Sequence, residues 1–516
     1  MMTDYSAVAP LFHTDAYKLD HKRQYDLAGT VTRVYSNYTN RKSRIPGVDE
    51  VVHFGLQAYI QRYLMDEFEP FFSAGRSQAS RLYEARVAQI LGPQAAKGIG
   101  SDHIRSLHAL GYLPLRFCAV PEGTPVPIGV PSFTVENTHP DFYWLTNFVE
   151  TGLSAGIWQA STSATIAHEY RKVLEEAAQN SGSDLARVDW QCHDFSYRGM
   201  SSHESAAASG AAHLLSFTGT DSLVSLDWID RYYGGSYVVG SVPATEHSVM
   251  CTGIESVGEL ETFSRLLDLY PSGVVSVVSD TFDLWRVLAE YLPALRDKIL
   301  ARNGKLVIRP DSGDPEKILC GDPDAPGGTP QWRGVLHLLY DTFGGARNDA
   351  GFIELNPRVG AIYGDSITLD RARSITERMA RLRWASTNVV FGVGSFTYQY
   401  NTRDTFGSAM KATWAEVNGE GVNLLKDPVT DGGTKKSATG RLAVLRKAKA
   451  FGGQMFLVEK AGLAAELNSV LQPVWQDGQF MRRQSFADVR ETLNRGGIHA
   501  SEVDRNARIS GRGEVA

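Results

Sequence analysis

The sequence lacks long apolar runs, an excess of positive charge and closely spaced cysteines. Its 516 residues include no uninterrupted apolar run of about 18 residues, so we expect no membrane-spanning helix. Lys and Arg number 52 against 58 Asp and Glu, a net charge of −6, which argues against a nucleic-acid binder held by bulk charge. The four cysteines include no CxxC pair, so we expect no metal–thiolate site.

The remaining composition is that of an ordinary globular protein. Hydrophobic residues make up 43% and charged residues 21%, which excludes a disordered chain. The length fits two or three domains. No basic segment followed by an apolar stretch opens the chain, so no signal peptide is predicted. We therefore expect a reduced, soluble, cytoplasmic protein with neither nucleic acid nor membrane as a partner.

Short apolar runs alternate with helical patterns in the middle of the chain. The runs end at the turns 193–195, 219–221, 241–247, 279–280, 309–313, 364–366 and 392–395. This alternation predicts a parallel sheet, and about seven units fit an irregular (β/α) barrel better than an open sheet. Ligands bind at the carboxyl ends of barrel strands, where these turns lie. One helix is predicted over 281–295, with Asp280 as its N-cap.

The turn at residues 309–314 (RPDSGD) carries groups that suit a phosphorylated sugar. Arg309 offers a planar fork of donors for phosphate oxygens, and Asp311 can hold a sugar hydroxyl or a metal-bound water. The backbone of residues 312–313 leaves N–H groups for an anion. The structural alternative is a type I turn joined by an Arg–Asp pair.

Two other turns supply an aromatic face and an imidazole. Phe195 and Tyr197 lie beside Arg198, which suits a flat heterocycle attached to a phosphorylated sugar, although both rings could also be core residues. His247 can act as a base, a nucleophile or a ligand. Spacing alone does not single it out among the 13 histidines.

A series of short motifs runs in order along residues 11–490. The motifs are 14–18 (TDAYK), 121–123 (PEG), 133–138 (FTVENT), 143–147 (YWLTN), 193–199 (HDFSYRG), 219–221 (GTD), 241–248 (SVPATEHS), 276–280 (SVVSD), 308–313 (IRPDSG), 364–365 (GD) and 426–429 (KDPV). In kind and order they resemble the nicotinamide phosphoribosyltransferases, within the type II phosphoribosyltransferase family.

The resemblance implies an α/β fold with two parts, an irregular (β/α) barrel and an outer α/β domain built from the N- and C-terminal segments. Residues 1–180 would form the N-terminal part of the outer domain and 181–400 the barrel with the active site. Residues 401–500 would complete the outer domain, and 501–516 would be a disordered tail. The family also implies a homodimer with shared active sites.

The implied reaction joins nicotinamide to phosphoribosyl pyrophosphate (PRPP), giving nicotinamide mononucleotide and pyrophosphate. The enzyme would be a pentosyl-transferring glycosyltransferase of pyridine nucleotide biosynthesis, acting in NAD salvage. Mg²⁺ is the implied cofactor, bound mainly through pyrophosphate near Asp280 and Asp311. ATP is the implied co-substrate and would be hydrolysed through a phosphohistidine at His247.

The resemblance also implies roles for single residues. The pyridine ring would lie between Phe195 and the partner subunit's Tyr17, and Asp221 would accept a hydrogen bond from the carboxamide. His247 and Asp311 are the implied catalytic residues. The other implied substrate contacts are Arg198, Ser241, Asp280, Arg309, Pro310, Gly364, Asp365, Gly394, Ser395 and Arg403. Further implied phosphate contacts are Arg41, Lys411, Lys426 and Lys435.

Three places depart from the family pattern. Ser395 and Phe396 stand where the family's loop has a further glycine. Lys435 matches only after one inserted residue is allowed. Residues 321–329 (GDPDAPGGT) differ in length and content and are predicted to form a surface loop.

Three other functions remain open at this point. A nicotinate phosphoribosyltransferase shares the fold, but Asp221 would repel the nicotinate carboxylate. A non-catalytic relative would not need both arginines, the aspartates and His247. A phosphosugar aldolase or isomerase would need a lysine or paired bases at the strand ends, and these turns carry no lysine. For Asp221 itself, the structural alternative is a cap on a helix beginning near Ser222.

Overall fold

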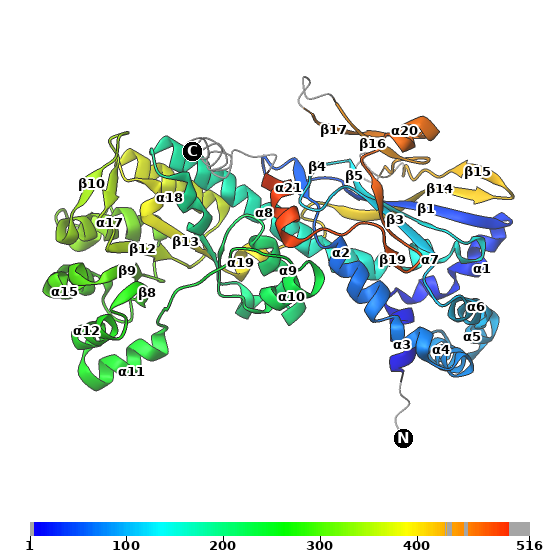
Figure 1. The fold of residues 1–516 in the computed structure, drawn as a ribbon, viewed down its shortest axis with the longest axis horizontal. Helices are drawn as coiled ribbons and strands as arrows, with labels where there is room; N and C mark the ends of the chain where they lie inside the picture. Colours follow the sequence, from blue (N-terminus) through cyan, green and yellow to red (C-terminus); the bar gives the residue numbers. More distant parts are fainter. Residues whose placement is uncertain (1–4, 429, 431–435, 448–452, 495–516) are drawn as a thin grey trace, which may run out of the picture. The chain divides into compact units, whose positions relative to one another are not determined.

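The structure, a computed structural model, describes residues 5–428, 430, 436–447 and 453–494. The chain forms two compact units (Figure 1). Of the described residues, the first unit takes in 5–165, Trp228–Ser236 and those between 401 and 494, and the second takes in Ile166–Asp227 and Tyr237–Tyr400. The predicted tail at 501–516 lies outside the described residues.

The first unit is organised around a seven-stranded antiparallel sheet with the order β15-β14-β1-β5-β3-β18-β19. The strands are β1 (Val31–Asn40), β3 (Leu115–Ala119), β5 (Pro131–Asn137), β14 (Ser408–Val417), β15 (Glu420–Asn423), β18 (Gln472–Gln476) and β19 (Gln479–Phe480). β1 from the N-terminal segment pairs with β14 from the C-terminal segment. The outer α/β domain predicted from the two terminal segments is therefore confirmed.

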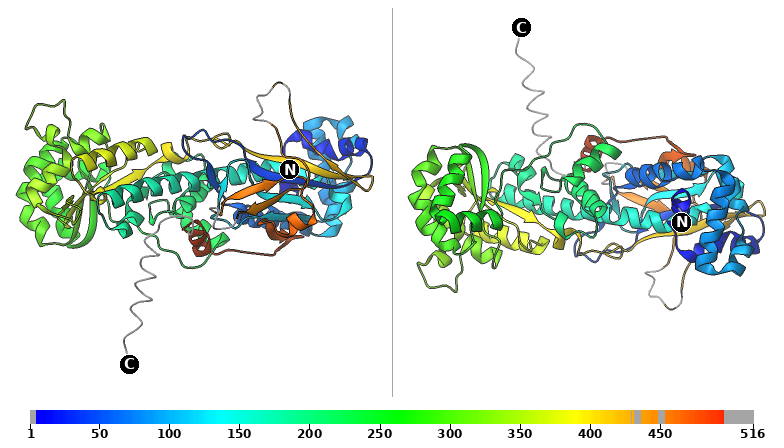
Figure 2. Two further views of the ribbon diagram at one scale, coloured as in Figure 1. Left: turned by 90° about the horizontal axis from the view of Figure 1, so that it is seen from above. Right: turned by 90° about the horizontal axis from the view of Figure 1, so that it is seen from below.

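Aromatic side chains form much of the core of this unit. The ring of Phe117 packs edge-on against Trp475, with centroids 5.9 Å apart, and Phe133 stacks on Tyr38 at 4.8 Å. These pairs join neighbouring strands of the sheet and add to the burial of apolar surface. Three helices cluster on the same unit and appear in blue in both views of Figure 2. They are α4 (Arg76–Leu91), α5 (Pro93–Ile99) and α6 (Asp102–Leu110).

The second unit contains a six-stranded parallel sheet with the order β7-β6-β13-β12-β9-β8. The strands are β6 (Cys192–Asp194), β7 (Gly219–Thr220), β8 (Ser272–Val278), β9 (Asn303–Arg309), β12 (Val359–Tyr363) and β13 (Val389–Val393). Every residue of β12 is buried, as expected for a parallel strand covered on both faces. This burial explains why the strands appear in the sequence as continuous apolar runs.

The segment at residues 240–245 joins the two edges of the parallel sheet. Gly240 pairs with Gly219 of β7, and Ala244 pairs with Ser276 of β8, both in the parallel sense. The two edge strands therefore share a neighbour, and the sheet closes on itself. The predicted irregular (β/α) barrel is confirmed.

Helices connect consecutive barrel strands. They include α9 (His203–His213), α11 (His247–Val257), α12 (Glu259–Leu269), α16 (Pro315–Cys320), α17 (Pro330–Phe343) and α18 (Leu369–Arg381), and a short helix, α19 (Ser395–Tyr398), follows the last barrel strand, β13. Residues 321–329 form the loop between α16 and α17, as predicted. None of the helices in the described part of the chain is long and apolar enough to cross a membrane.

The predicted start of one helix is wrong. The pattern at 281–295 folds as α13 (Leu284–Arg286), a π-helical stretch at Val287–Tyr291 and α14 (Leu292–Ala294). Asp283, not Asp280, is the N-cap, and its side chain accepts hydrogen bonds from the backbone of residues 285 and 286. Asp280 bonds instead to the turn after β9, as described below.

Candidate active site

Asp221 follows β7 and lies in a cluster of polar side chains at the carboxyl end of the barrel. Its Oδ1 accepts a hydrogen bond from His193 Nε2 at 3.0 Å and another from the Ser241 hydroxyl. Burial opposes the ionisation of Asp221, but these hydrogen bonds and the positive charge of Arg309 outweigh it and lower the pKa of Asp221. Within the described residues, Asp221 Oδ2 has no hydrogen-bond partner, so a charged oxygen remains available to a ligand.

The structural alternative for Asp221, a cap on the following helix, is wrong. The backbone N–H of Ser222 donates to Thr220 Oγ1 at 2.9 Å. The helix itself, α10 (Val224–Tyr232), begins only at Val224. The Asp221 side chain bonds to His193 and Ser241 instead.

Phe195 places an aromatic face next to this carboxylate. The rings of His193 and Phe195 are 4.6 Å apart, so His193 contacts both Phe195 and Asp221. One side of the Phe195 ring lies against backbone: a Cβ at Gly392 would be 2.9 Å from the ring. The Arg309 guanidinium lies 5.4 Å from the ring centroid, within the range of a cation–π contact.

Two carboxylates and an imidazole surround the turn after β9. Arg309 Nη2 donates to Asp311 Oδ2 at 2.8 Å, which is the Arg–Asp pair expected from the structural alternative for this turn. The guanidinium of Arg309 also contacts the ring of Phe195. Asp280 Oδ2 accepts from Asp311 N at 2.9 Å and from Ser312 Oγ at 2.5 Å. His247 Nε2 lies 3.6 Å from Asp280 Oδ1. An arginine, two acids and a histidine from three loops thus share one site.

The predicted phosphate loops follow β12 and β13 at the same end of the barrel, where Gly364, Asp365, Gly394 and Ser395 lie. Ser366, the next residue after Asp365, has a φ of 53°, which is uncommon for a residue with a side chain. Gly199 packs closely on Ser395, because a Cβ at Gly199 would be 2.0 Å from Ser395 Oγ. This contact brings the turn that carries Arg198 beside the loop after β13.

Tyr17 belongs to the first unit and is exposed. It lies in a 3-10 helix at Ala16–Asp20, and 63% of its surface is accessible. Its neighbour Lys18 is buried and donates to Asn147 O at 2.7 Å and to Glu150 Oε2 at 2.6 Å. Buried bonds therefore hold the short helix while the tyrosine ring remains free to meet another molecule.

The predicted phosphate cations of the first unit form an electrostatic cluster. Arg41 and Lys411 line one cavity of about 310 Å³. Burial lowers the pKa of Lys411, Glu150 opposes this effect, and repulsion from Arg41, Lys426 and Arg403 adds to it. A lysine that three other cations repel marks a positively charged region that is suited to a multiply charged anion.

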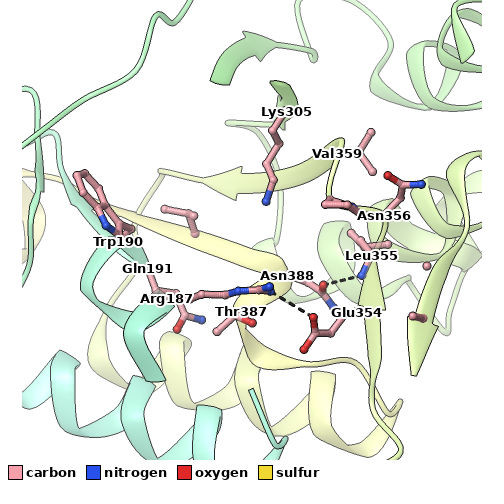
Figure 3. A pocket seen from close by; sticks show the side chains of 14 residues that line it. Arg187, Trp190, Gln191, Lys305, Glu354, Leu355, Asn356, Val359, Thr387 and Asn388 are labelled. Carbon is pink, nitrogen blue, oxygen red and sulfur yellow. Dashed lines mark hydrogen bonds and ion pairs between the residues drawn. The ribbon is translucent and has the colours of Figure 1, made fainter. Parts of the chain in front are cut away.

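A larger cavity, of about 590 Å³, lies at the opposite ends of the barrel strands (Figure 3). Trp190 and Gln191, which precede β6, line it, and Figure 3 shows Lys305 of β9 reaching into it. Arg187 and Glu354 form an ion pair of 3.3 Å at its wall. None of the predicted site residues that the structure describes lines this cavity. The candidate active site lies instead at the carboxyl ends, where parallel barrels carry their chemistry.

Three residues that lie in or beside the candidate site and the 310 Å³ cavity, His193, Asp194 and Lys436, were given no role from the sequence. His193 and Asp194 belong to a quoted motif, but their contacts with residues 220–221 depend on how β6 pairs with β7, which spacing does not reveal. Lys435 lies outside the described residues. Its neighbour Lys436 lines the 310 Å³ cavity and pairs with Asp427 at 3.0 Å.

Comparison with known proteins agrees with this geometry. The profile of the nicotinate phosphoribosyltransferase (NAPRTase) family matches residues 190–470. A protein of Acinetobacter baylyi named nicotinamide phosphoribosyltransferase is 48% identical over 94% of this chain and 97% of its own length. A protein of the same name from Xanthomonas campestris pv. campestris is 33% identical over 93% of this chain and 97% of its own length.

Two crystal structures share the fold. Nicotinate-nucleotide pyrophosphorylase from Pyrococcus furiosus aligns with a TM-score of 0.54 at 15% identity, over 96% of each chain. Human nicotinic acid phosphoribosyltransferase aligns with a TM-score of 0.53 at 16% identity, over 94% of this chain and 93% of its own. The profile match and the length of the sequence matches decide the family: this chain belongs to the nicotinate phosphoribosyltransferase family.

Proposed function

We propose that this chain is an enzyme that transfers the phosphoribosyl group of PRPP to nicotinamide, giving nicotinamide mononucleotide and pyrophosphate. One observation carries the proposal: His193 contacts both Asp221 and the ring of Phe195, so a carboxylate and an aromatic face stand side by side. The carboxylate can accept a hydrogen bond from the carboxamide NH₂ while the pyridine ring stacks on Phe195. The relative of 48% identity that bears this activity in its name supports the choice of base.

The charges of the site suit the departure of pyrophosphate. As the bond to the sugar breaks, negative charge grows on the pyrophosphate and positive charge on the ribose. Arg198, Arg309 and His247 meet the negative end. Asp280 and Asp311 hold the ribose side, where carboxylates stabilise the growing positive charge. The neutral ring nitrogen of nicotinamide needs no base, because stacking and the Asp221 hydrogen bond orient it for attack.

The carboxylates of this site fit Mg²⁺ held mainly through the substrate. Among the described residues, no group of three His, Cys, Asp or Glu could hold a metal ion by itself. Asp280 Oδ1 is nevertheless buried without a hydrogen-bond donor, and Mg²⁺ is usually bound by one or two carboxylates together with substrate phosphates. Asp280 and Asp311 are the residues that would hold it. When bound, Mg²⁺ neutralises charge on the leaving pyrophosphate.

A turnover assay tests the proposed function. The purified protein is given PRPP and Mg²⁺ with nicotinamide, nicotinate or quinolinate, and both nucleotide and pyrophosphate are measured. We expect equal amounts of both products with nicotinamide and little of either with the two acids, because Asp221 repels a carboxylate at that position. Faster turnover with nicotinate would instead assign the chain to the acid-specific enzymes, and no pyrophosphate release with any base would indicate a non-catalytic relative.

ATP is the co-substrate in this proposal and His247 its phosphate acceptor. An unprotonated ring nitrogen of His247 attacks the γ-phosphorus, ADP leaves, and water later breaks the N–P bond. His247 is 52% exposed and is the first residue of α11. A helix N-terminus stabilises an added phosphate through its free N–H groups and its dipole.

The site is completed, in our proposal, by a second copy of the chain. Tyr17 and the cluster of Arg41, Arg403, Lys411 and Lys426 belong to the first unit, whereas Phe195 and Asp221 belong to the second. In this proposal one face of the base stacks on Phe195, and a second aromatic ring covers the other face. The exposed partner subunit's Tyr17 would supply it.

Mixing two inactive variants tests this shared site. Tyr17→Ala and Asp221→Ala proteins are each expected to be nearly inactive. After subunit exchange at equal amounts, half of the dimers would be hybrids with one intact site in two, so activity should return to about a quarter of the wild-type value. The rate of nicotinamide mononucleotide formation measures the recovery.

The matched control mixes Asp221→Ala with Phe195→Ala. Both changes lie in the second unit, so neither chain of the hybrid carries an intact Phe195 together with an intact Asp221. No site is therefore restored. Recovery in the first mixture alone supports the shared site. Equal activity in both mixtures, after mass spectrometry has verified exchange, would contradict it.

A further inference from the structure

Asp194 is a completely buried carboxylate at the end of β6, between the turns that carry Phe195 and Asp221. Its exposed fraction is 0%. Its Oδ1 accepts from the backbone N–H of Ser196 at 2.9 Å, and its Oδ2 accepts from Thr220 Oγ1 at 3.1 Å. One side chain therefore connects the turn after β6 to the turn after β7.

These two bonds bracket the residues that contact the base. On one side, Phe195 N donates to Val393 O at 2.8 Å, and the next N–H is held by Asp194. On the other side, Asp221 N donates to the carbonyl of Asp194 at 2.9 Å. Thr220 Oγ1, which donates to the Asp194 carboxylate, also accepts from the N–H after Asp221. The backbone is thus fixed on both sides of Asp221 and immediately after Phe195.

Among the described residues, hydrogen bonds and not an ion pair hold the Asp194 carboxylate. In the described part of the chain, no lysine or arginine forms an ion pair with Asp194. The negative charge of Asp194 raises the pKa of His213, but burial outweighs this effect and lowers the pKa to about 4. The imidazole of His213 is therefore neutral near pH 7. The two ring nitrogens of His213 face Tyr398 Oη at 2.6 Å and Gly219 O at 3.1 Å. Burying a carboxylate without an ion-pair partner lowers the stability of the folded protein. This cost suggests that Asp194 has a role other than packing.

We propose that Asp194 is a positioning residue for base selection, which holds the ring of Phe195 and the carboxylate of Asp221 at the spacing that a pyridine carboxamide requires. This inference rests on the proposed nicotinamide transfer. The residue touches no substrate, so its effect passes through Phe195 and Asp221. A small displacement of either group weakens both stacking and the hydrogen bond to the carboxamide, and misplacement by about 1 Å can cost about 100-fold in rate.

Asp194→Asn and Thr220→Val break this link from its two ends. Asparagine keeps one acceptor for Ser196 N but turns an NH₂ group toward Thr220, whose hydroxyl then loses its acceptor. Valine keeps the shape of Thr220 and removes the hydroxyl. We expect each variant to lower kcat/KM for nicotinamide by about 10- to 100-fold, mainly through KM for nicotinamide. KM for PRPP should change by less than about 3-fold, and the double variant should be no worse than the poorer single variant.

Two control variants separate positioning from loss of stability. Thr220→Ser keeps the hydroxyl and should retain kcat/KM near the wild-type value. Ser181→Ala removes a buried hydroxyl that accepts from Ser386 N at 3.1 Å, near the opposite, amino end of β13. We expect it to lower the melting temperature while leaving KM for nicotinamide unchanged.

A folded Asp194→Asn protein with wild-type KM and base preference would overturn the inference, as would equal losses for nicotinamide and PRPP. If Asp194→Asn does not fold, Thr220→Val decides in the same way, because it leaves Asp194 in place. Wild-type protein that does not use nicotinamide would instead refute the proposed function. The two failures are therefore distinguishable.

Discussion

Replacing Asp221 by serine is expected to reduce the preference for nicotinamide over nicotinate by up to about 10⁴-fold, the size of discrimination reached when a polar partner that the bound ligand buries is left unmatched. The Asp221 side chain is 43% exposed in the empty site, so the bound base itself must cover it. Nicotinamide offers an NH₂ donor where nicotinate carries an anionic oxygen. The free Oδ2 of Asp221 accepts from the first and repels the second. Serine removes the charge, so nicotinamide use should fall and nicotinate use should rise.

The charge of Asp221 is secured by its surroundings. Burial alone would favour the neutral acid, but hydrogen bonds from His193 and Ser241 and the positive charge of Arg309 lower its pKa below the usual value. A carboxylate with a lowered pKa stays ionised throughout the range from about pH 5 to 8. The wild-type preference for nicotinamide should therefore be flat over this range, and any loss should appear only at lower pH, where Asp221 gains a proton.

The measurement is kcat/KM for both bases with wild-type and Asp221→Ser protein, together with the melting temperatures. Asp297→Ser is a matched control, because the Asp297 side chain is 99% exposed in the same unit. It should change neither quantity. Unchanged selectivity in a well-folded Asp221→Ser protein would contradict the role of Asp221 in base choice.

The barrel could be predicted because its strands are buried on both faces. Such strands appear in the sequence as short apolar runs, and each ends where the chain turns polar. The start of the helix after β8 could not be predicted, because Asp280 and Asp283 are both suitable N-caps. The Asp280 carboxylate instead accepts hydrogen bonds from Asp311 N and Ser312 Oγ. These donors lie about 30 residues further along the chain, so no local sequence pattern reveals them.

The site could be predicted as a set of residues but not as a network. The carboxyl ends of parallel strands meet, so Asp221, Arg309 and His247 were expected at one end of the barrel. The partners of Asp221 were not: His193 precedes it by 28 residues, and Ser241 belongs to the segment that closes the barrel. Which hydrogen bond each residue makes depends on strand pairing and side-chain direction, and these are tertiary properties.

Replacing His247 by alanine is expected to abolish ATP hydrolysis and the acid-labile phosphoenzyme, while slow transfer to nicotinamide without ATP continues. Asp280 Oδ1 lies 3.6 Å from the imidazole, and its other oxygen is fixed by residues 311 and 312. Phosphorylation would add about two negative charges beside the loop that binds pyrophosphate. The phosphohistidine would thereby repel Asp280 and rearrange the turn after β9, which couples ATP use to the transfer step.

The phosphoenzyme is measured with γ-³²P-labelled ATP, before and after acid treatment, and transfer is followed with and without ATP. His203→Ala is the control, since His203 is another exposed histidine of the second unit and pairs with Tyr197 Oη at 2.6 Å. That variant should keep the label. Because an alanine side chain has no nitrogen that could form an N–P bond, label that persists at wild-type level in the His247→Ala protein would assign the phosphate to another residue. Loss of the label together with the ATP-independent transfer would show that His247 serves the transfer step itself, through its place beside Asp280, and not only the coupling to ATP.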